Sequence, residues 1–109
     1  MTFRSLALVM TLCLALPGVA VAQLSPSAQR GLTFVRANCS TCHAVEQVGS
    51  SALRLAPPFR ELYLRYPVET LRRPLLEGIR TTDHQNMPEF RLDPGQASDV
   101  IAYLKSFER

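Results

Sequence analysis

Two cysteines and a histidine lie within five residues of this chain, in the sequence Cys39-Ser40-Thr41-Cys42-His43. The 109 residues include only three cysteines and two histidines, so most of the thiols and half of the imidazoles are gathered here. On a helix, Cys39 and Cys42 are three residues apart and His43 follows Cys39 by about one turn. All three side chains would then face the same side. Such a cluster suits a disulfide, a metal ion or a covalently attached cofactor.

The first 22 residues have the features of an export signal. Arg4 supplies a positive charge, Leu6–Leu16 is an apolar run, and Ala20-Val21-Ala22 is a cleavage site of the A-x-A type. We therefore expect cleavage after Ala22 and a mature domain of residues 23–109 in the periplasm. The apolar run has 11 residues, whereas a helix needs about 20 to span a bilayer, so a retained membrane anchor is the less favoured alternative.

The third cysteine, Cys13, lies in the export segment and would be removed with it. Leu12 stands before it where a lipid-attachment site would have a small residue, so we do not expect lipidation. In an oxidising compartment, Cys39 and Cys42 would be paired, metallated or covalently modified. The mature chain would have 11 basic and 9 acidic residues, a balance too mild to indicate binding to nucleic acid or to an anionic membrane.

The sequence predicts an all-α fold of three to five short helices, since no stretch alternates as a strand would. The first helix should begin at Ser25-Pro26, which pairs an N-cap residue with proline at the first helical position, and extend to about Thr41. Gly31 inside this helix costs about 1 kcal/mol relative to alanine. We expect the close approach of another helix to require it; a simply tolerated glycine is the alternative.

The last helix repeats the same start signal at Asp93-Pro94. Val100, Leu104 and Phe107 follow at helical spacing and form an apolar stripe. We expect this stripe to belong to the hydrophobic core and not to contact a cofactor.

Prolines divide the segment between these two helices. Pro57-Pro58 should open a helical turn over residues 59–64, and Pro67 should start a helix over residues 68–76. Pro74 removes a backbone donor within the second of these, so a kink or two short pieces are expected there. A loop should follow over residues 79–92.

The spacing of Cys39, Cys42 and His43 is typical of covalent attachment of a c-type haem. Two thiols would reach one edge of a flat macrocycle while the imidazole nitrogen reaches the metal at its centre. A redox disulfide is less favoured because it would suit a βαβ context, which is not visible. A zinc site would need four ligands and the remote ligand pair of a zinc finger, which is missing. A structural disulfide is the third alternative.

Met87 is the only methionine of residues 23–109, and it precedes Pro88 in the expected loop. Proline disfavours helix at the preceding residue, and a thioether on such a fixed turn is well suited to reach a metal. We therefore expect Met87 to be the second axial ligand, because His/Met ligation raises the haem potential and suits electron transfer. The alternatives are His84, which would give a bis-histidine haem, and an open coordination position.

These features together resemble the class I c-type cytochromes, in particular short bacterial single-haem members, over residues 23–109. The resemblance implies a cytochrome c fold in which the N- and C-terminal helices cross around one haem c. It implies that Cys39 and Cys42 form the thioether bonds, that His43 is the proximal ligand and that Met87 is the distal one.

The resemblance also implies supporting contacts around the haem. The carbonyl of a proline, either Pro57 or Pro58, would accept a hydrogen bond from the proximal imidazole and orient it. The chain departs from the family pattern in having no tryptophan to bind a haem propionate. Arg60, Tyr66, another arginine or tyrosine, or water would have to do so instead.

Further matches and departures concern the helices and the surface. Gly31 and Tyr103 match the glycine and the aromatic residue at the helix crossing of the family, whereas Val35 stands where an aromatic residue is common. Lys105 is the only lysine, so the ring of lysines that steers partners in some members is missing.

The function expected from the sequence is a periplasmic electron carrier, not an enzyme, that exchanges one electron with redox partner proteins. A dedicated haem subunit of a larger periplasmic oxidoreductase is the main alternative. An enzyme or gas sensor with an open iron position is the other. The protein would be a monomer or one subunit of a complex.

Overall fold

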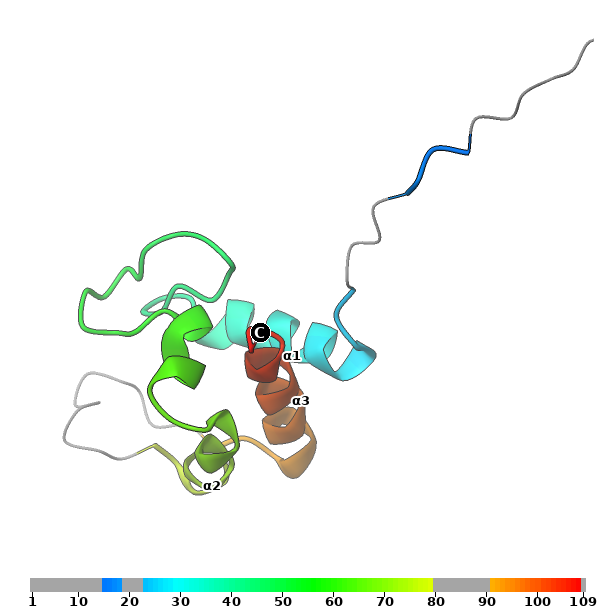
Figure 1. Cartoon of the computed structure of the whole chain (residues 1–109). Coiled ribbons are helices and arrows are strands. Elements are labelled where there is room, and N and C mark those ends of the chain that lie inside the picture. The colour runs from blue at the N-terminus through cyan, green and yellow to red at the C-terminus, as the bar shows by residue number, and fades with distance from the viewer. Residues whose placement is uncertain (1–14, 19–22, 80–90, 109) are drawn as a thin grey trace, which may run out of the picture.

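The computed structural model describes residues 15–18, 23–79 and 91–108 of the chain. The helices are α1 (Pro26–Asn38), the 3₁₀ helices η1 (Phe59–Leu64) and η2 (Val68–Leu71), α2 (Arg72–Glu77) and α3 (Pro94–Lys105). No strand occurs within these described residues, so the all-α prediction is confirmed. Figure 1 shows α1 and α3 lying across one another, with η1, η2 and α2 packed to one side of them.

Both long helices begin where the sequence predicts, and side chains cap them. The Ser25 hydroxyl accepts a hydrogen bond from the backbone N–H of Ala28 at 3.1 Å. At α3, the Asp93 carboxylate accepts from the N–H of Gln96 at 2.8 Å. The Gln96 side chain in turn accepts from the N–H of Asp93 at 3.1 Å. This capping box satisfies two helix-end donors that would otherwise lack partners.

The end of α1 differs from the sequence prediction, since the helix stops at Asn38 and not near Thr41. Polar side chains bind the carbonyls of its last turn. The Asn38 amide donates to the carbonyl four residues earlier at 2.9 Å, and the Ser40 hydroxyl donates to the carbonyl of Arg36 at 2.5 Å. Such local bonds compete with continued helical pairing, so the residues after Asn38 form turns.

The division expected near Pro74 is confirmed, and it falls between Leu71 and Arg72. Pro74 is the third residue of α2, where the backbone N–H groups have no partner within the helix. The missing N–H therefore costs no hydrogen bond there. Gly78 follows the last residue of the helix, and its φ of 95° lies in the region that favours glycine.

Helices α1 and α3 approach each other closely at Gly31. A Cβ added there would lie 2.0 Å from the carbonyl oxygen of Asp99 and 2.9 Å from Cβ of Tyr103. Next to this contact, the Asp99 carboxylate accepts hydrogen bonds from Arg30 Nε at 2.9 Å and from the Ser27 hydroxyl at 2.6 Å. Close approach of a second helix thus explains the glycine, and the tolerated-glycine alternative is wrong.

A hydrophobic core fills the space between the crossed helices and the shorter ones. Val35 and Val68 are fully buried within it. Its buried members are Ala28, Val35, Val45, Phe59, Leu62, Val68, Leu75, Leu92, Ala97, Val100, Tyr103, Leu104 and Phe107. In the part of the chain that the structure describes, no helix is long and apolar enough to cross a membrane.

Candidate functional site

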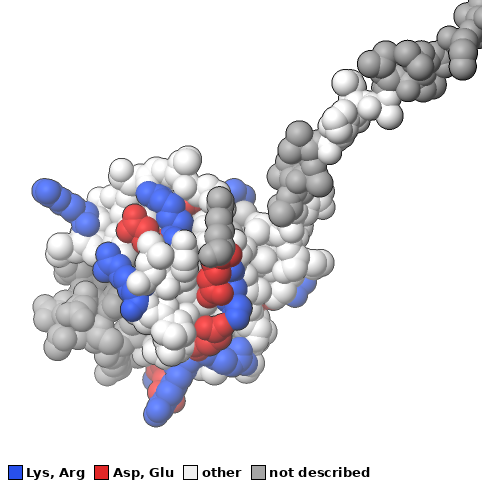
Figure 2. Space-filling view, viewed as in Figure 1, with Lys and Arg blue, Asp and Glu red and all other residues white. Residues whose placement is uncertain are grey.

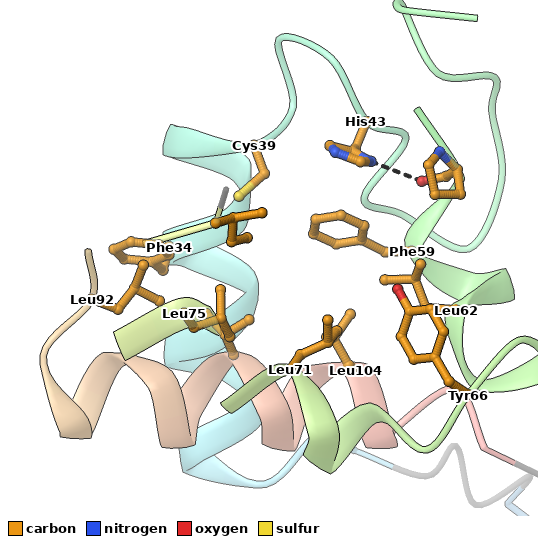
Figure 3. A pocket seen from close by; sticks show the side chains of 13 residues that line it. Phe34, Cys39, His43, Phe59, Leu62, Tyr66, Leu71, Leu75, Leu92 and Leu104 are labelled. Atoms are coloured by element: carbon orange, nitrogen blue, oxygen red, sulfur yellow. Dashed lines mark hydrogen bonds between the residues drawn. The ribbon is translucent and has the colours of Figure 1, made fainter. Parts of the chain in front are cut away.

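A largely apolar cavity opens beside the core, and all five helices contribute to its wall. It encloses about 590 Å³ of empty space, counting the part that is open to solvent. The lining residues are Phe34, Cys39, His43, Pro57, Phe59, Leu62, Tyr66, Leu71, Leu75, Ile79, Leu92, Val100 and Leu104. Figure 3 shows the labelled side chains surrounding an open space.

Val100 and Leu104 of α3 belong to the core and to the cavity wall at once. The prediction that the apolar stripe of the last helix belongs to the core is confirmed, and these two residues line the cavity as well. They are four positions apart and lie one above the other on the same helix face. That face meets both the core and the cavity, so helical spacing alone could not separate the two roles.

The imidazole of His43 is held on one side by the chain. Its Nδ1 lies 2.8 Å from the carbonyl oxygen of Pro57. The carbonyl of Pro58 instead accepts from the N–H of Glu61 at 3.0 Å. A carbonyl can only accept, so Nδ1 carries a proton and donates this bond. In the neutral imidazole the lone pair would then be on Nε2. In Figure 3 the second ring nitrogen lies on the side of Cys39, opposite the dashed hydrogen bond.

Hydrogen bonds also fix the backbone on both sides of His43. The His43 N–H donates to the carbonyl of Cys39 at 2.9 Å and closes the turn that follows α1. The next residue, Ala44, donates to the Ser51 hydroxyl at 2.9 Å and accepts from the N–H of Phe59 at 2.9 Å. The rings of His43 and Phe59 are 4.9 Å apart at an angle of 43°. The imidazole orientation is thus set by the folded chain itself.

The two cysteines differ in their relation to the cavity. Cys39 lines it, whereas Cys42 is not among the lining residues. Both are partly buried free thiols. Burial, and to a smaller extent the nearby charge of Cys42, raises the pKa of the Cys39 thiol to about 11. The expectation that both cysteines and His43 face one side on a helix is wrong in this respect, because α1 ends before Cys39.

Two polar side chains, those of Tyr66 and Arg60, could bind an acidic group. Tyr66 lines the cavity, and burial raises the pKa of its phenol. Its hydroxyl points in among the lining side chains in Figure 3. Arg60 is not a lining residue, but its Nη1 is shielded from solvent and has no hydrogen-bond partner in the described part of the chain.

Met87 and His84 lie in the segment 80–90, outside the described residues. Within the described ranges, no three or more side chains of His, Cys, Asp or Glu gather into a group that could hold a metal ion. Most residues of the apolar wall, such as Phe34, Leu71 and Leu75, could not be recognised from the sequence as cavity residues. These residues look like any other core positions until the fold places them around the cavity.

The donors and the wall of the cavity fit a haem c. The wall offers aliphatic and aromatic contacts for a flat apolar body, Cys39 offers a thiol at its edge, and His43 offers a nitrogen ligand with the opposite ring nitrogen already bonded. The shielded Nη1 of Arg60 is a further donor of the kind that an anionic group needs.

Comparison with known families gives one match. The sequence model described as cytochrome c matches residues 28–108, which include all but the first two residues of the described helices. Neither the curated proteins nor the solved structures give a match to this chain.

Proposed function

The chain belongs to the cytochrome c family, and we propose that it is an exported carrier of one haem whose axial ligands are His43 and Met87. Membership of the family makes it a haem-binding electron carrier with covalently held haem c. We further propose attachment through Cys39 and Cys42 and a periplasmic location after cleavage behind Ala22. The haem, when bound, supplies an iron that takes up and releases one electron.

The hydrogen bond between His43 Nδ1 and the Pro57 carbonyl, 2.8 Å long, is the observation that carries this proposal. Imidazoles that bind a metal generally donate their other N–H to a carbonyl or carboxylate. That contact fixes the ring orientation and makes the ligating nitrogen more basic. Here the partner is in place, and the ring lies beside Cys39 in the wall of an apolar cavity.

The apolar wall has a second role in this proposal, because it keeps water away from the redox centre. A dry, weakly polarisable surrounding disfavours the more highly charged state of a metal centre and so tunes its potential. With both axial positions taken by side chains, no substrate could reach the iron. The protein would then supply a potential and an orientation, which is what a carrier needs.

The proposed partners are redox proteins that dock transiently. On the face shown in Figure 2, basic and acidic side chains are interspersed, and neither kind gathers into a patch of one sign. The expected mature chain has 11 basic and 9 acidic residues, so electrostatic steering should be modest. Transient redox complexes use small interfaces, below about 1,200 Å² in total, so a large docking patch is not required.

A dedicated haem subunit of a larger periplasmic oxidoreductase is the second candidate. Val48 and Leu55 favour it, because they are 79% and 85% exposed in the segment that joins α1 to η1. Large apolar side chains in water suit a lasting interface better than a brief one. Co-purification from native periplasm tests this: a stable complex supports the subunit, and recovery of the monomer alone supports the free carrier.

The decisive experiment compares visible spectra of the mature protein, ferric and then reduced with dithionite, for wild type, Met87→Ala and His84→Ala. We expect a c-type reduced spectrum for wild type, loss of the iron–sulfur charge-transfer band in Met87→Ala, and its retention in His84→Ala. Retention of the band in Met87→Ala would refute the proposed ligand. Absence of haem from wild type, made together with the haem-attachment machinery, would refute the function as a whole.

A further inference from the structure

Tyr103 of α3 reaches across the molecule to the segment that follows His43. Its side chain is buried, with 3% of its surface exposed, and its hydroxyl donates a hydrogen bond to the carbonyl of Val45. Val45 is itself buried and lies only two residues after His43. Burial, aided by the charge of Glu46, raises the pKa of the Tyr103 phenol to about 12, so the hydroxyl keeps its proton and remains a donor.

The ring of Tyr103 cannot shift independently of the helix crossing. Its Cβ lies 2.9 Å from the position that a Cβ on Gly31 would take. On the other side, the ring meets that of Phe107 edge to face, with centroids 5.1 Å apart. The Tyr103 hydroxyl is therefore held in place by the same packing that holds α1 against α3.

Val45 lies close along the chain to His43, and one hydrogen bond connects its neighbour Ala44 to the segment that contains Pro57. Ala44 alone separates Val45 from His43, so a shift at Val45 acts on the imidazole. The Ala44 carbonyl also accepts from the N–H of Phe59 at 2.9 Å, and Phe59 follows Pro57 by two residues. A shift of the backbone at Val45 would thus also move the Pro57 carbonyl, which accepts the hydrogen bond from His43.

A second tie holds this segment to α1, but it is weaker. Arg36 forms an ion pair with Glu46, and the two side chains are 56% and 44% exposed. Exposed ion pairs contribute little to stability because water competes for both partners. The Tyr103 hydroxyl bond is buried, and its loss would leave the Val45 carbonyl without that donor. The hydrogen bond from the Tyr103 hydroxyl is thus the stronger of these two links between the long helices and the segment after His43.

We propose that Tyr103 is a positioning residue for the proximal imidazole: its hydroxyl bond to Val45 keeps the His43 ring at hydrogen-bonding distance from Pro57 and so helps to set the reduction potential. This inference rests on the proposed ligation by His43. A weaker Nδ1–H···O bond makes Nε2 a poorer electron donor, which destabilises the ferric state more than the ferrous one. Loss of the hydroxyl should therefore raise the potential.

The test uses Tyr103→Phe in the mature holoprotein, which removes the hydroxyl and keeps the ring contacts. Ser27→Ala is the matched control, because it removes another hydroxyl that bridges α1 and α3 without touching the segment after His43. In Tyr103→Phe we expect the ratio of reduced to oxidised protein at a fixed potential to rise at least threefold, or about 28 mV at 59 mV per tenfold. Ser27→Ala should leave this ratio unchanged.

Hydrogen exchange gives a second readout that follows the bond directly. The His43 Nδ1–H should exchange about fivefold faster in Tyr103→Phe, the factor that one net hydrogen bond contributes to an opening equilibrium. In wild type it should exchange as slowly as the amides of Val35 and Val100, since it opens only when the crossing does.

Equal potentials in Tyr103→Phe and Ser27→Ala, or a His43 Nδ1–H that exchanges much faster in wild type than those amides, would overturn the inference. Haem content and the iron–sulfur band are verified first in each protein. Failure at that stage counts against the proposed function, whereas failure of the two readouts counts against Tyr103 alone.

Discussion

Replacing Gly31 by alanine should destabilise the protein by about 2 kcal/mol. The new Cβ would lie 2.0 Å from the carbonyl oxygen and 2.6 Å from the carbonyl carbon of Asp99, well inside van der Waals contact. Both neighbours are backbone atoms of α3, so no side chain can turn aside and the two helices must separate. Overpacking of this kind costs up to about 3 kcal/mol, and the better helix propensity of alanine offsets about 1 kcal/mol of that.

Denaturant unfolding of the mature holoprotein, followed by far-UV circular dichroism, measures this difference. Gly95→Ala is the control, because Gly95 is also helical and a Cβ there would meet only a side-chain oxygen of Asp93, at 3.2 Å. We expect that variant to be at least as stable as wild type, because the better helix propensity of alanine, about 1 kcal/mol, offsets a small shift of the Asp93 carboxylate. If Gly31→Ala is no less stable than Gly95→Ala, the helices do not need the glycine to approach one another and the reasoning is wrong.

Two further predictions concern the helix ends and the crossing. Asp93→Ala should lower the free energy of unfolding by about 1 kcal/mol through loss of the α3 cap, or about 4–8 °C in Tm, and an unchanged thermal melt would contradict the capping box. Hydrogen bonds from Arg30 and then Ser27 hold the pKa of the Asp99 carboxyl below its usual value. A depressed pKa stabilises the fold above about pH 4 and loses that effect as the pH falls through the folded-state value. The free energy of unfolding of wild type, measured with denaturant, should therefore fall more in acid than that of Asp99→Asn. Equal acid sensitivity of the two proteins would refute a role for this carboxylate.

Features of the fold with a local cause could be predicted from the sequence. Ser25 and Asp93 cap their helices through atoms three residues away, and Pro74 acts on its own backbone nitrogen. Gly31 was assigned correctly because a helical glycine has a cost that some contact must offset. In each case the sequence neighbours contain the physical reason.

Features that depend on distant contacts could not be predicted in the same way. The choice between Pro57 and Pro58 follows from the path of the chain over the 14 positions from His43 to its acceptor. The bond of Tyr103 to Val45 joins residues 58 positions apart, and no pattern in either segment indicates it. The early end of α1 comes from side-chain bonds to carbonyls that compete with a helical pattern otherwise able to continue.

The shared wall of core and cavity has a consequence for how such a protein can change over evolution. Phe59, Leu62, Leu75, Leu92, Val100 and Leu104 are buried core residues and cavity residues at the same time. A substitution at any of them alters the thermal tolerance of the chain and the electronic surroundings of its cofactor in one step. Tyr103 is a core residue that does not line the cavity, so a substitution there would leave the wall intact and would act on the potential only through the proposed contact with the segment after His43.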